Sequence, residues 1–213
     1  VVIGANVAGG VVIDVRPADN DATSTDEDAD GITDSLEGNA VVNSYGAAPA
    51  VTVGSATRGV TLGVAGTGNN AYGLINRGTI NGDGVYDGIA ATAVRLGVTG
   101  GQTVTIAGGV RNEGSIAALG RNAGATAIAI NAGVTMPRFD NIATITAGVS
   151  STLANSPTVG IAIAAGANLP SIFNNGSILS TSGGGVSTVT GIQDLSGTVT
   201  SIVNAGSLQA VLV

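Results

Sequence analysis

The sequence predicts an all-β fold, a parallel β-helix (β-solenoid) with three short strands in each coil of about 32 residues. The main observation is a phrase that occurs five times, in which an asparagine precedes any residue, a small residue, Thr or Ser, and an aliphatic residue. These asparagines, which lie 36, 29, 33 and 30 residues apart, are Asn76, Asn112, Asn141, Asn174 and Asn204. A period of this length indicates one supersecondary unit that stacks on copies of itself.

Two further patterns repeat with a similar period. The first places a threonine in a short alternating run, and its members are Thr92, Thr126, Thr158 and Thr190. The second leads into the asparagine phrase, and its members are residues 104–106, 169–172 and 199–202. Short alternating runs favour strands, and the 35 glycines between them favour turns. We expect each strand to pair in parallel with its counterpart one coil away, at a spacing of about 4.8 Å.

Each repeated residue has an expected structural role. The aliphatic residue that ends the phrase should point inward and stack on its counterparts, which are Ile80, Ile116, Ile145, Ile178 and Leu208. The asparagine side chains should hydrogen-bond along the stack or cap the turns, and we do not interpret them as a binding site. The small residue should be a glycine with positive φ at a corner, so Ala143 predicts a corner of different shape.

Composition excludes most catalytic chemistry, and we predict that the chain is not an enzyme. It has no Cys for thiolate chemistry and no His to act as a metal ligand or general base. Its seven basic residues are all Arg and form no basic patch, which argues against a nucleic-acid partner. Polar residues and glycines interrupt every apolar run, so we expect no membrane span in this segment.

Charge is concentrated near the start of the sequence. Residues 14–37 carry nine acidic side chains and one Arg, a net charge of −8, while the remaining residues carry five acids and six Arg, a net charge of +1. We therefore divide the chain into residues 1–39, an N-terminal strand followed by an acidic calcium-binding segment, and residues 40–213, the repeat solenoid.

Residues 26–37 follow the pattern D-x-D-x-D-G-x-x-D-x-x-E, which is typical of a calcium loop. Alternate carboxylates surround a hard cation, Gly31 makes a sharp turn, one backbone carbonyl contributes, and a final Glu closes the site. The predicted ligands are Asp26, Asp28, Asp30, Ile32, Asp34 and Glu37, and the predicted cofactor is Ca²⁺. The alternative is a solvated acidic linker, which the polar residues 19–25 also fit.

One further acid pair, Asp83 and Asp87, lies outside this segment. Some β-solenoids degrade polysaccharides with acids and basic residues on an outer face, and Arg77 and Arg95 are candidates to flank the pair. Only 2% of the residues are aromatic, so platforms for sugar rings are scarce, and we prefer to interpret the pair as part of a polar turn.

The asparagine phrases, together with residues 70–76 and 194–206, resemble the passenger region of autotransporter-type surface proteins of Gram-negative bacteria. This resemblance covers most of residues 40–213. It implies an extended β-solenoid outside the cell, associated with the outer membrane at the bacterial surface. The acidic loop resembles the calcium repeats of thrombospondin type 3.

These observations lead us to expect a structural extracellular protein, a calcium-stabilised subunit of a bacterial surface layer, filament or fibre. The ends of a solenoid expose strand edges, and residues 1–3 and 208–213 are largely apolar, so we expect a homo-oligomer or polymer formed through the ends. Two alternatives stay open. One is a monomeric adhesin or ligand-binding passenger with a cell-surface or glycan ligand, and the other is a polysaccharide-degrading β-helix.

Overall fold

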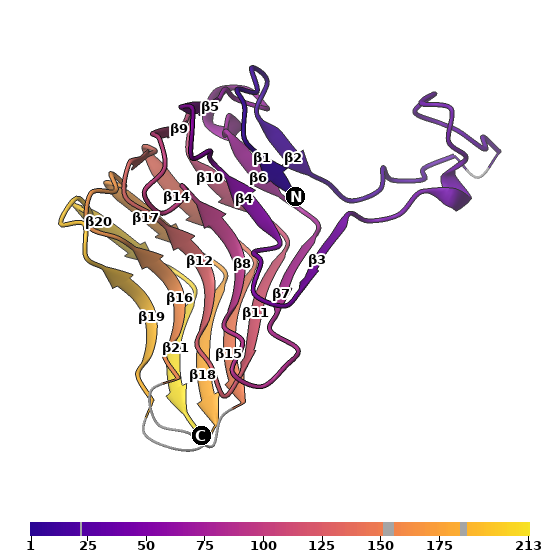
Figure 1. The fold of residues 1–213 in the computed structure, drawn as a ribbon. Helices are drawn as coiled ribbons and strands as arrows, with labels where there is room; N and C mark the ends of the chain where they lie inside the picture. Colours follow the sequence, from indigo (N-terminus) through magenta and orange to yellow (C-terminus); the bar gives the residue numbers. More distant parts are fainter. Residues whose placement is uncertain (22, 151–155, 184–186) are drawn as a thin grey trace.

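The computed structural model describes residues 1–21, 23–150, 156–183 and 187–213, and it confirms the predicted parallel β-solenoid (Figure 1). Each coil passes through three long sheets, and several coils add a short strand in a fourth. All pairs of named strands in the described residues are parallel. The strands of successive coils therefore lie side by side along one axis, from the N-terminal to the C-terminal coil.

We name the sheets A to D in the order in which the chain visits them. Sheet A contains β1 (Val2–Ile3), β4 (Val51–Val53), β8 (Ala91–Leu96), β12 (Ala125–Ile130), β16 (Thr158–Ile163) and β19 (Val189–Asp194). The short sheet B contains β5 (Val60–Leu62), β9 (Val104–Ile106) and β13 (Val134–Thr135). Sheet C contains β2 (Val11–Ile13), β6 (Leu74–Asn76), β10 (Val110–Asn112), β14 (Arg138–Asn141), β17 (Ser171–Asn174) and β20 (Ser201–Asn204). Sheet D contains β3 (Val41–Tyr45), β7 (Thr79–Asp83), β11 (Ser115–Arg121), β15 (Thr144–Ser150), β18 (Ser177–Gly183) and β21 (Ser207–Leu212).

The asparagine phrase spans the corner between sheets C and D. Each asparagine ends a strand of sheet C, and the side-chain Nδ2 of the first four donates to Oδ1 of the asparagine in the next coil. The four distances, from Asn76 to Asn204, are 2.8, 2.8, 2.7 and 2.6 Å. We call this column of hydrogen-bonded side chains the asparagine ladder. Four of the five asparagines are at most 2% exposed, so the ladder lies inside the protein, where unpaired amides would be costly. The expected structural role of these residues is confirmed.

Glycine is favoured at this corner by close contact between coils and not by the sign of φ. Gly78, Gly114 and Gly176 do not have the positive φ that we expected. Instead, a Cβ at Gly114 would lie 2.1 Å from the carbonyl oxygen of Gly78, and one at Gly176 would lie 2.0 Å from that of Ala143. A side chain at either glycine would therefore require the backbone of the neighbouring coil to move away.

One backbone hydrogen bond at the Ala143 corner is longer than its counterparts. The backbone N–H of the residue after each corner donates to the corner carbonyl of the preceding coil. This distance is 3.2 Å from Thr144 to Gly114, compared with 2.9 Å from Ser115 to Gly78, 2.7 Å from Ser177 to Ala143 and 2.8 Å from Ser207 to Gly176. The longer bond is consistent with an alanine Cβ that separates the two coils slightly.

The aliphatic residues at the start of the sheet D strands form a continuous stack in the core. Ile80, Ile116, Ile145 and Ile178 are at most 2% exposed and pair with one another in register. Leu208, their counterpart in β21, is 41% exposed because no further described coil covers it. The predicted stack is confirmed.

The other two predicted columns contain errors of register. Thr92 pairs with Thr126, but Thr126 pairs with Val159, while Thr158 pairs with Ala125. Residues 104–106 belong to sheet B, whereas residues 171–174 align in sheet C with Val110–Asn112 through β14. The second column therefore merged two sheets.

The first coil lies on both sides of the acidic segment. Strand β1 pairs with β4, and β2 pairs with β6, so the N-terminal residues, which we grouped with the acidic segment in residues 1–39, take part in the sheets. The chain then leaves the stack after Ile13 and returns at β3, which pairs with β7. The acidic segment occupies the C-to-D corner of this coil, where later coils have a tight turn.

Candidate metal centre

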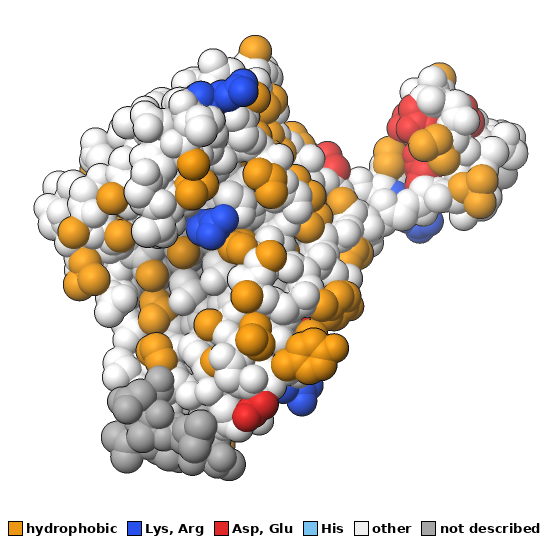
Figure 2. Space-filling model, in the orientation of Figure 1, with side chains coloured by type: hydrophobic (Ala, Val, Ile, Leu, Met, Phe, Trp, Pro, Cys, Tyr) orange, Lys and Arg blue, Asp and Glu red, His pale blue; other side chains and the backbone are white. Residues whose placement is uncertain are grey.

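The acidic segment projects away from the stacked coils, on the side of the N-terminal strands (Figure 1). Acidic side chains gather on this projection, whereas the face of the solenoid seen in Figure 2 is mostly uncharged. Its regular structure in the described residues is one short 3₁₀ helix, η1 (Asp34–Leu36). A second such helix, η2 (Gly68–Asn70), lies in the solenoid.

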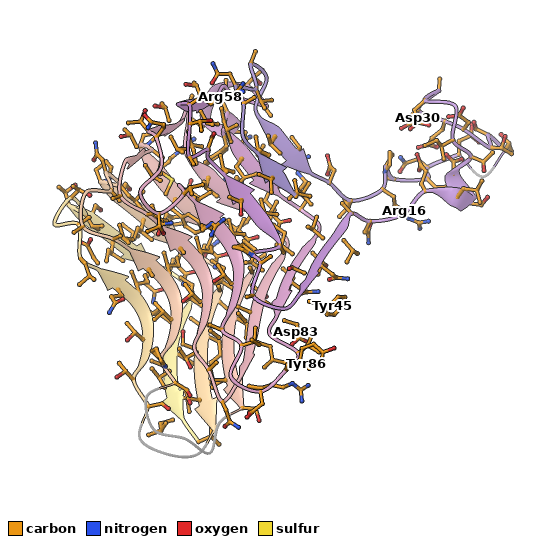
Figure 3. The ribbon with its side chains drawn as sticks, in the orientation of Figure 1. Arg16, Asp30, Tyr45, Arg58, Asp83 and Tyr86 are labelled. Atoms are coloured by element: carbon orange, nitrogen blue, oxygen red, sulfur yellow. The ribbon has the colours of Figure 1, made fainter. Side chains whose placement is uncertain are left out.

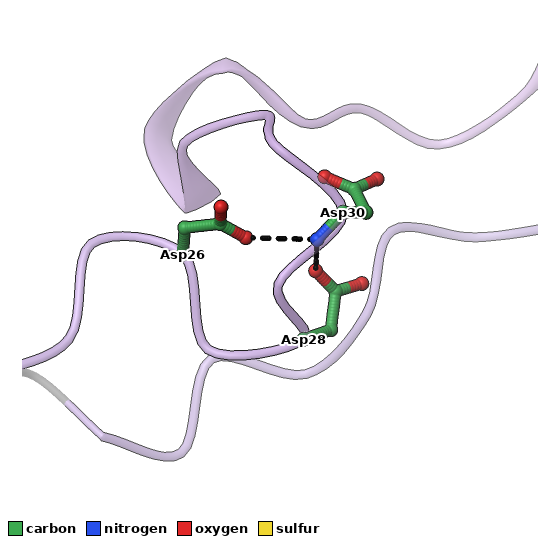
Figure 4. Close-up of side chains that lie close together, drawn as sticks. All are labelled: Asp26, Asp28 and Asp30. Carbon is green, nitrogen blue, oxygen red and sulfur yellow. Dashed lines mark hydrogen bonds between the residues drawn. The ribbon is translucent and has the colours of Figure 1, made fainter.

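Three of the predicted ligands lie together. Asp26, Asp28 and Asp30 each offer a carboxylate oxygen, and these oxygens lie within 4.8 Å of one another. The backbone N–H of Asp30 donates to Oδ1 of Asp26 at 3.2 Å and to Oδ1 of Asp28 at 3.3 Å (Figure 4). The carboxylates therefore converge on one turn of backbone.

The turn contains two residues with a positive φ. Gly31 has a φ of +89°, and its N–H donates to Oδ2 of Asp26 at 3.1 Å. Ala29 also has a positive φ, +58°, which is uncommon for a residue with a Cβ. Ile32 contacts the cluster through its N–H, which donates to Oδ1 of Asp30 at 2.7 Å.

The last two predicted ligands lie near this cluster but outside the group of three. Asp34 accepts a hydrogen bond from the N–H of Glu27 through Oδ1, while its Oδ2 is buried and has no hydrogen-bond partner among the described residues. Loss of hydration, followed by the negative charges of Asp28, Asp30, Asp34 and Asp26, raises the pKa of Glu37. The segment therefore holds uncompensated negative charge.

The residues fit a hard divalent cation. Calcium takes oxygen ligands at about 2.3–2.6 Å, so two oxygens on opposite sides of the ion lie about 4.6–5.2 Å apart. The spacing of the three aspartates falls in this range or below it. The buried, unpaired Oδ2 of Asp34 would also gain a partner if it coordinated an ion.

Glu27, which the calcium pattern does not use, accepts hydrogen bonds from the residues that precede the loop. Its carboxylate accepts from the N–H of Asn20 at 2.9 Å and from the N–H of Asp21 at 2.8 Å. Asp21 in turn accepts from the hydroxyl and N–H of Thr23, and these hydrogen bonds lower the pKa of Asp21. These contacts fold the residues before the loop back against it.

A row of ion pairs ties the base of the segment to the solenoid. Asp14, the first residue after β2, pairs with Arg77 at 3.0 Å. Arg77 also pairs with Glu113 at 2.7 Å, and Glu113 pairs with Arg111 at 2.5 Å. Although partial burial acts to raise it, the hydrogen bonds from Arg77 and Arg111 lower the pKa of Glu113.

A second cluster surrounds Tyr72, which is 1% exposed. Its hydroxyl donates to Asp140, and the guanidinium of Arg138 lies over its ring, 4.1 Å from the centroid. Burial and then the hydrogen bond to Asp140 raise the pKa of the Tyr72 phenol. The sequence patterns did not predict this cluster, although Arg138 and Asp140 place two opposite charges two residues apart in one strand.

The structure does not bring the second acid pair and its expected arginines together. Asp83 ends β7 in sheet D, and Asp87 accepts a hydrogen bond from Asn122 at 2.5 Å. Arg77 is paired with Asp14 and Glu113, and Arg95 lies in sheet A. The proposed flanking of this pair by two arginines is therefore wrong.

Comparisons with known proteins give no family: the chain matches no protein-family model, no curated protein and no solved structure. Among the described residues, no helix has the length and apolar character needed to cross a membrane.

Proposed function

We propose that this chain is a structural extracellular protein, a calcium-stabilised β-solenoid subunit of a bacterial surface layer, filament or fibre that assembles through its ends. The observation that carries the proposal is the pairing of the sheets. Sheets A, C and D each end in an edge strand at both ends of the stack: β1, β2 and β3 at one end, and β19, β20 and β21 at the other.

The two ends are complementary in type. Every strand runs parallel to its neighbour, so the edge of β19, β20 and β21 in one copy presents the same three-sheet arrangement that β1, β2 and β3 of another copy would extend. Such a contact joins two different surfaces, and repetition of it gives an open chain of subunits.

Both ends also expose apolar side chains. Val2 at the N-terminal end is 75% exposed, and Ile202 and Leu212 at the C-terminal end are 50% and 53% exposed. The counterpart of Ile202 one coil earlier, Ile172, is fully buried. An added strand would bury this surface, which favours association by roughly 25 cal/mol for each Å² of apolar area.

Calcium supports this function by stiffening the acidic segment beside the N-terminal edge. Five acids within residues 26–34 repel one another at neutral pH, and a bound divalent cation removes this repulsion. Extracellular calcium sites bind weakly, with Kd of about 10⁻⁴–10⁻³ M, which suits a location outside the cell. The resemblance to autotransporter passengers points to the same location.

Light-scattering mass after size-exclusion chromatography, with millimolar Ca²⁺ and then with excess chelator, tests the proposal. We expect a mass well above 20.3 kDa with Ca²⁺ and a smaller mass after chelation. A monomer under both conditions would overturn the assembly and favour a solitary adhesin-like passenger.

A matched pair of variants identifies the contact surface. Ile202→Lys places a charge at the inward-facing position of the last sheet C strand and should give a monomer, because charged edges resist strand addition. Ile142→Lys introduces the same charge at another exposed isoleucine, 37% exposed, in the middle of the stack, and should assemble normally. Equal assembly of both variants would show that the C-terminal edge is not used.

A further inference from the structure

We propose that the outer face of sheet D, at its first three strands, binds a neutral oligosaccharide. Strand β3, which lines part of this site, is also the edge strand of sheet D at the N-terminal end, but the site lies on the outer face of the sheet and not along its strand edge. A groove of about 240 Å³ lies on this face, and the residues that line it include Asn43, Tyr45, Asn81, Asp83, Ala117 and Leu119.

Strand register explains why these side chains meet. Tyr45, Asp83 and Leu119 pair across β3, β7 and β11, and so do Asn43, Asn81 and Ala117. Residues two apart on a strand point to the same face, so the two rows lie next to each other on the outer surface. The small side chain of Ala117 leaves room at the floor of the groove.

Two of the three tyrosines of the chain lie at this face. Tyr45 is 74% exposed, and Tyr86, in the turn after β7, is 72% exposed, whereas Tyr72 is buried in the solenoid. Figure 3 shows Tyr45 and Tyr86 on the same side of the molecule as Asp83. Tyr45 lines the groove, and Tyr86 lies in the turn that follows Asp83, another residue of the lining.

The turn that carries Tyr86 is held in a strained conformation. Val85 has a φ of +58°, which is rare for a β-branched residue, and its N–H donates to Oδ1 of Asp83 at 2.8 Å. Strain of this kind is typical of binding and catalytic sites. The same carboxylate thus fixes the turn and lines the groove.

The polar groups of the groove suit hydroxyl ligands. Asn81 Nδ2 donates to Asn43 Oδ1 at 3.0 Å, which leaves the Nδ2 of Asn43 as a donor and the Oδ1 of Asn81 as an acceptor toward solvent. In the part of the chain that the structure describes, Oδ2 of Asp83 also has no hydrogen-bond donor. Sugar hydroxyls both donate and accept, and the apolar face of a pyranose can pack on a tyrosine ring.

The charge of the groove favours a neutral sugar. Asp83 is the one charged residue among the described residues that line it, so an anionic ligand such as a sialylated or sulfated glycan would be repelled. A neutral oligosaccharide that runs along the solenoid axis could contact all three strands.

The test is titration of cellohexaose, xylohexaose, mannohexaose and chitohexaose, with a sulfated heparin oligosaccharide as the anionic comparison. Tyrosine difference absorbance reports directly on the site, because the chain has no Trp and its third tyrosine is buried. We expect at least one neutral oligosaccharide to bind and to perturb the tyrosine signal. Absence of binding by all four up to about 10 mM, or binding of the sulfated oligosaccharide alone, would overturn the proposal.

Variants of the exposed side chains locate the binding. Tyr45→Ala should weaken it about tenfold or more, whereas Tyr45→Phe, which keeps the ring, should stay within about threefold. Val41→Ala removes another exposed side chain from the same face of β3 and should leave binding unchanged. Binding that is equal in Tyr45→Ala and the unmodified chain would place the sugar elsewhere and overturn the assignment of this groove.

Failure of this site is distinguishable from failure of the assembly proposal. The Ile202→Lys variant, which we expect to be monomeric, keeps the groove intact and should bind the same oligosaccharide with unchanged affinity per subunit.

Discussion

The solenoid body and the acidic segment differ in how their polar side chains are buried, charged and hydrogen-bonded. In the body, the asparagines are buried, uncharged and paired with one another from coil to coil. In the segment, the carboxylates are partly or fully exposed, share one sign of charge and accept hydrogen bonds from nearby N–H groups. The asparagines of the body therefore supply partners for one another, whereas Asp26, Asp28 and Asp30 have no ion pair with a basic residue in the described part of the chain.

The largest expected effect comes from breaking the ladder in the body. Asn141→Ala removes hydrogen bonds to Asn112 and Asn174 and leaves buried amide groups unpaired, which should cost about 3 kcal/mol of the free energy of unfolding. Chemical denaturation monitored by circular dichroism measures it.

The exposed pair of Asn81 with Asn43 provides the matched control. Asn43→Ala breaks an amide–amide hydrogen bond of similar length at the surface and should change the free energy of unfolding by less than about 0.5 kcal/mol. Equal losses in the two variants would show that burial does not set the strength of the ladder.

Calcium should act on the segment and leave the body unchanged. At a hundred times its Kd, Ca²⁺ would stabilise the segment by about 2.7 kcal/mol against local opening. Hydrogen exchange over residues 14–40 should slow with Ca²⁺, and exchange in the sheets should not. Asp30→Ala should abolish this response, whereas Asp19→Ala, with the same loss of charge outside the predicted ligands, should retain it. If Ca²⁺ still slowed exchange over these residues in Asp30→Ala, the predicted calcium site would be wrong.

The ion pairs at the base connect the two regions and are expected to contribute less. Glu113→Gln should lower the free energy of unfolding by about 1 kcal/mol at neutral pH, because Glu113 is 23% exposed and Arg77 is 41% exposed. The folded-state pKa of Glu113 is lowered, so its contribution is present above the ordinary pKa of glutamate and is lost as the pH falls through the folded-state value. Denaturation of both proteins over a pH series should show their difference shrinking in acid, and a constant difference would contradict this account.

The smallest effect is a pH response of opposite sign in the segment. Because loss of hydration and then the neighbouring carboxylates raise the pKa of Glu37, its ionisation destabilises the segment, and protonation at lower pH relieves this cost. Hydrogen exchange measures this response once the rates are corrected for the intrinsic exchange rate at each pH. Without Ca²⁺, we expect the protection of residues 14–40 to increase as the pH falls toward the raised pKa. With saturating Ca²⁺, this increase should disappear. Protection that decreases in acid without Ca²⁺ would contradict it.

The fold could be predicted because the repeated asparagine must align with the asparagine of the adjacent coil. An amide that is buried in every coil must find an identical partner, so the phrase fixes the alignment of sheet C and of the corner beyond it. The threonine column lacks such a constraint. Thr158 and Val159 are both β-branched and suit a strand equally well, and a shift of one residue exchanges the two faces.

The ion pairs could have been found from the same phrase. Arg77 and Glu113 occupy the position after the asparagine in adjacent coils, and Asp14 follows Ile13, which pairs in register with Asn76. Opposite charges in one column predict contacts between coils. The groove near Tyr45 could not be found this way, because Tyr45 lies in the first coil, before the asparagine phrases begin.

The asparagine ladder also gives the molecule an internal direction. Each amide nitrogen donates to the oxygen of the following coil, so all the side-chain dipoles point the same way. The series starts at Asn76, whose buried Oδ1 has no hydrogen-bond partner among the described residues, because Ile13 occupies the preceding place. The ladder thus meets a buried hydrocarbon at one end and closes on an exposed amide, that of Asn204, at the other, so its two ends are chemically different.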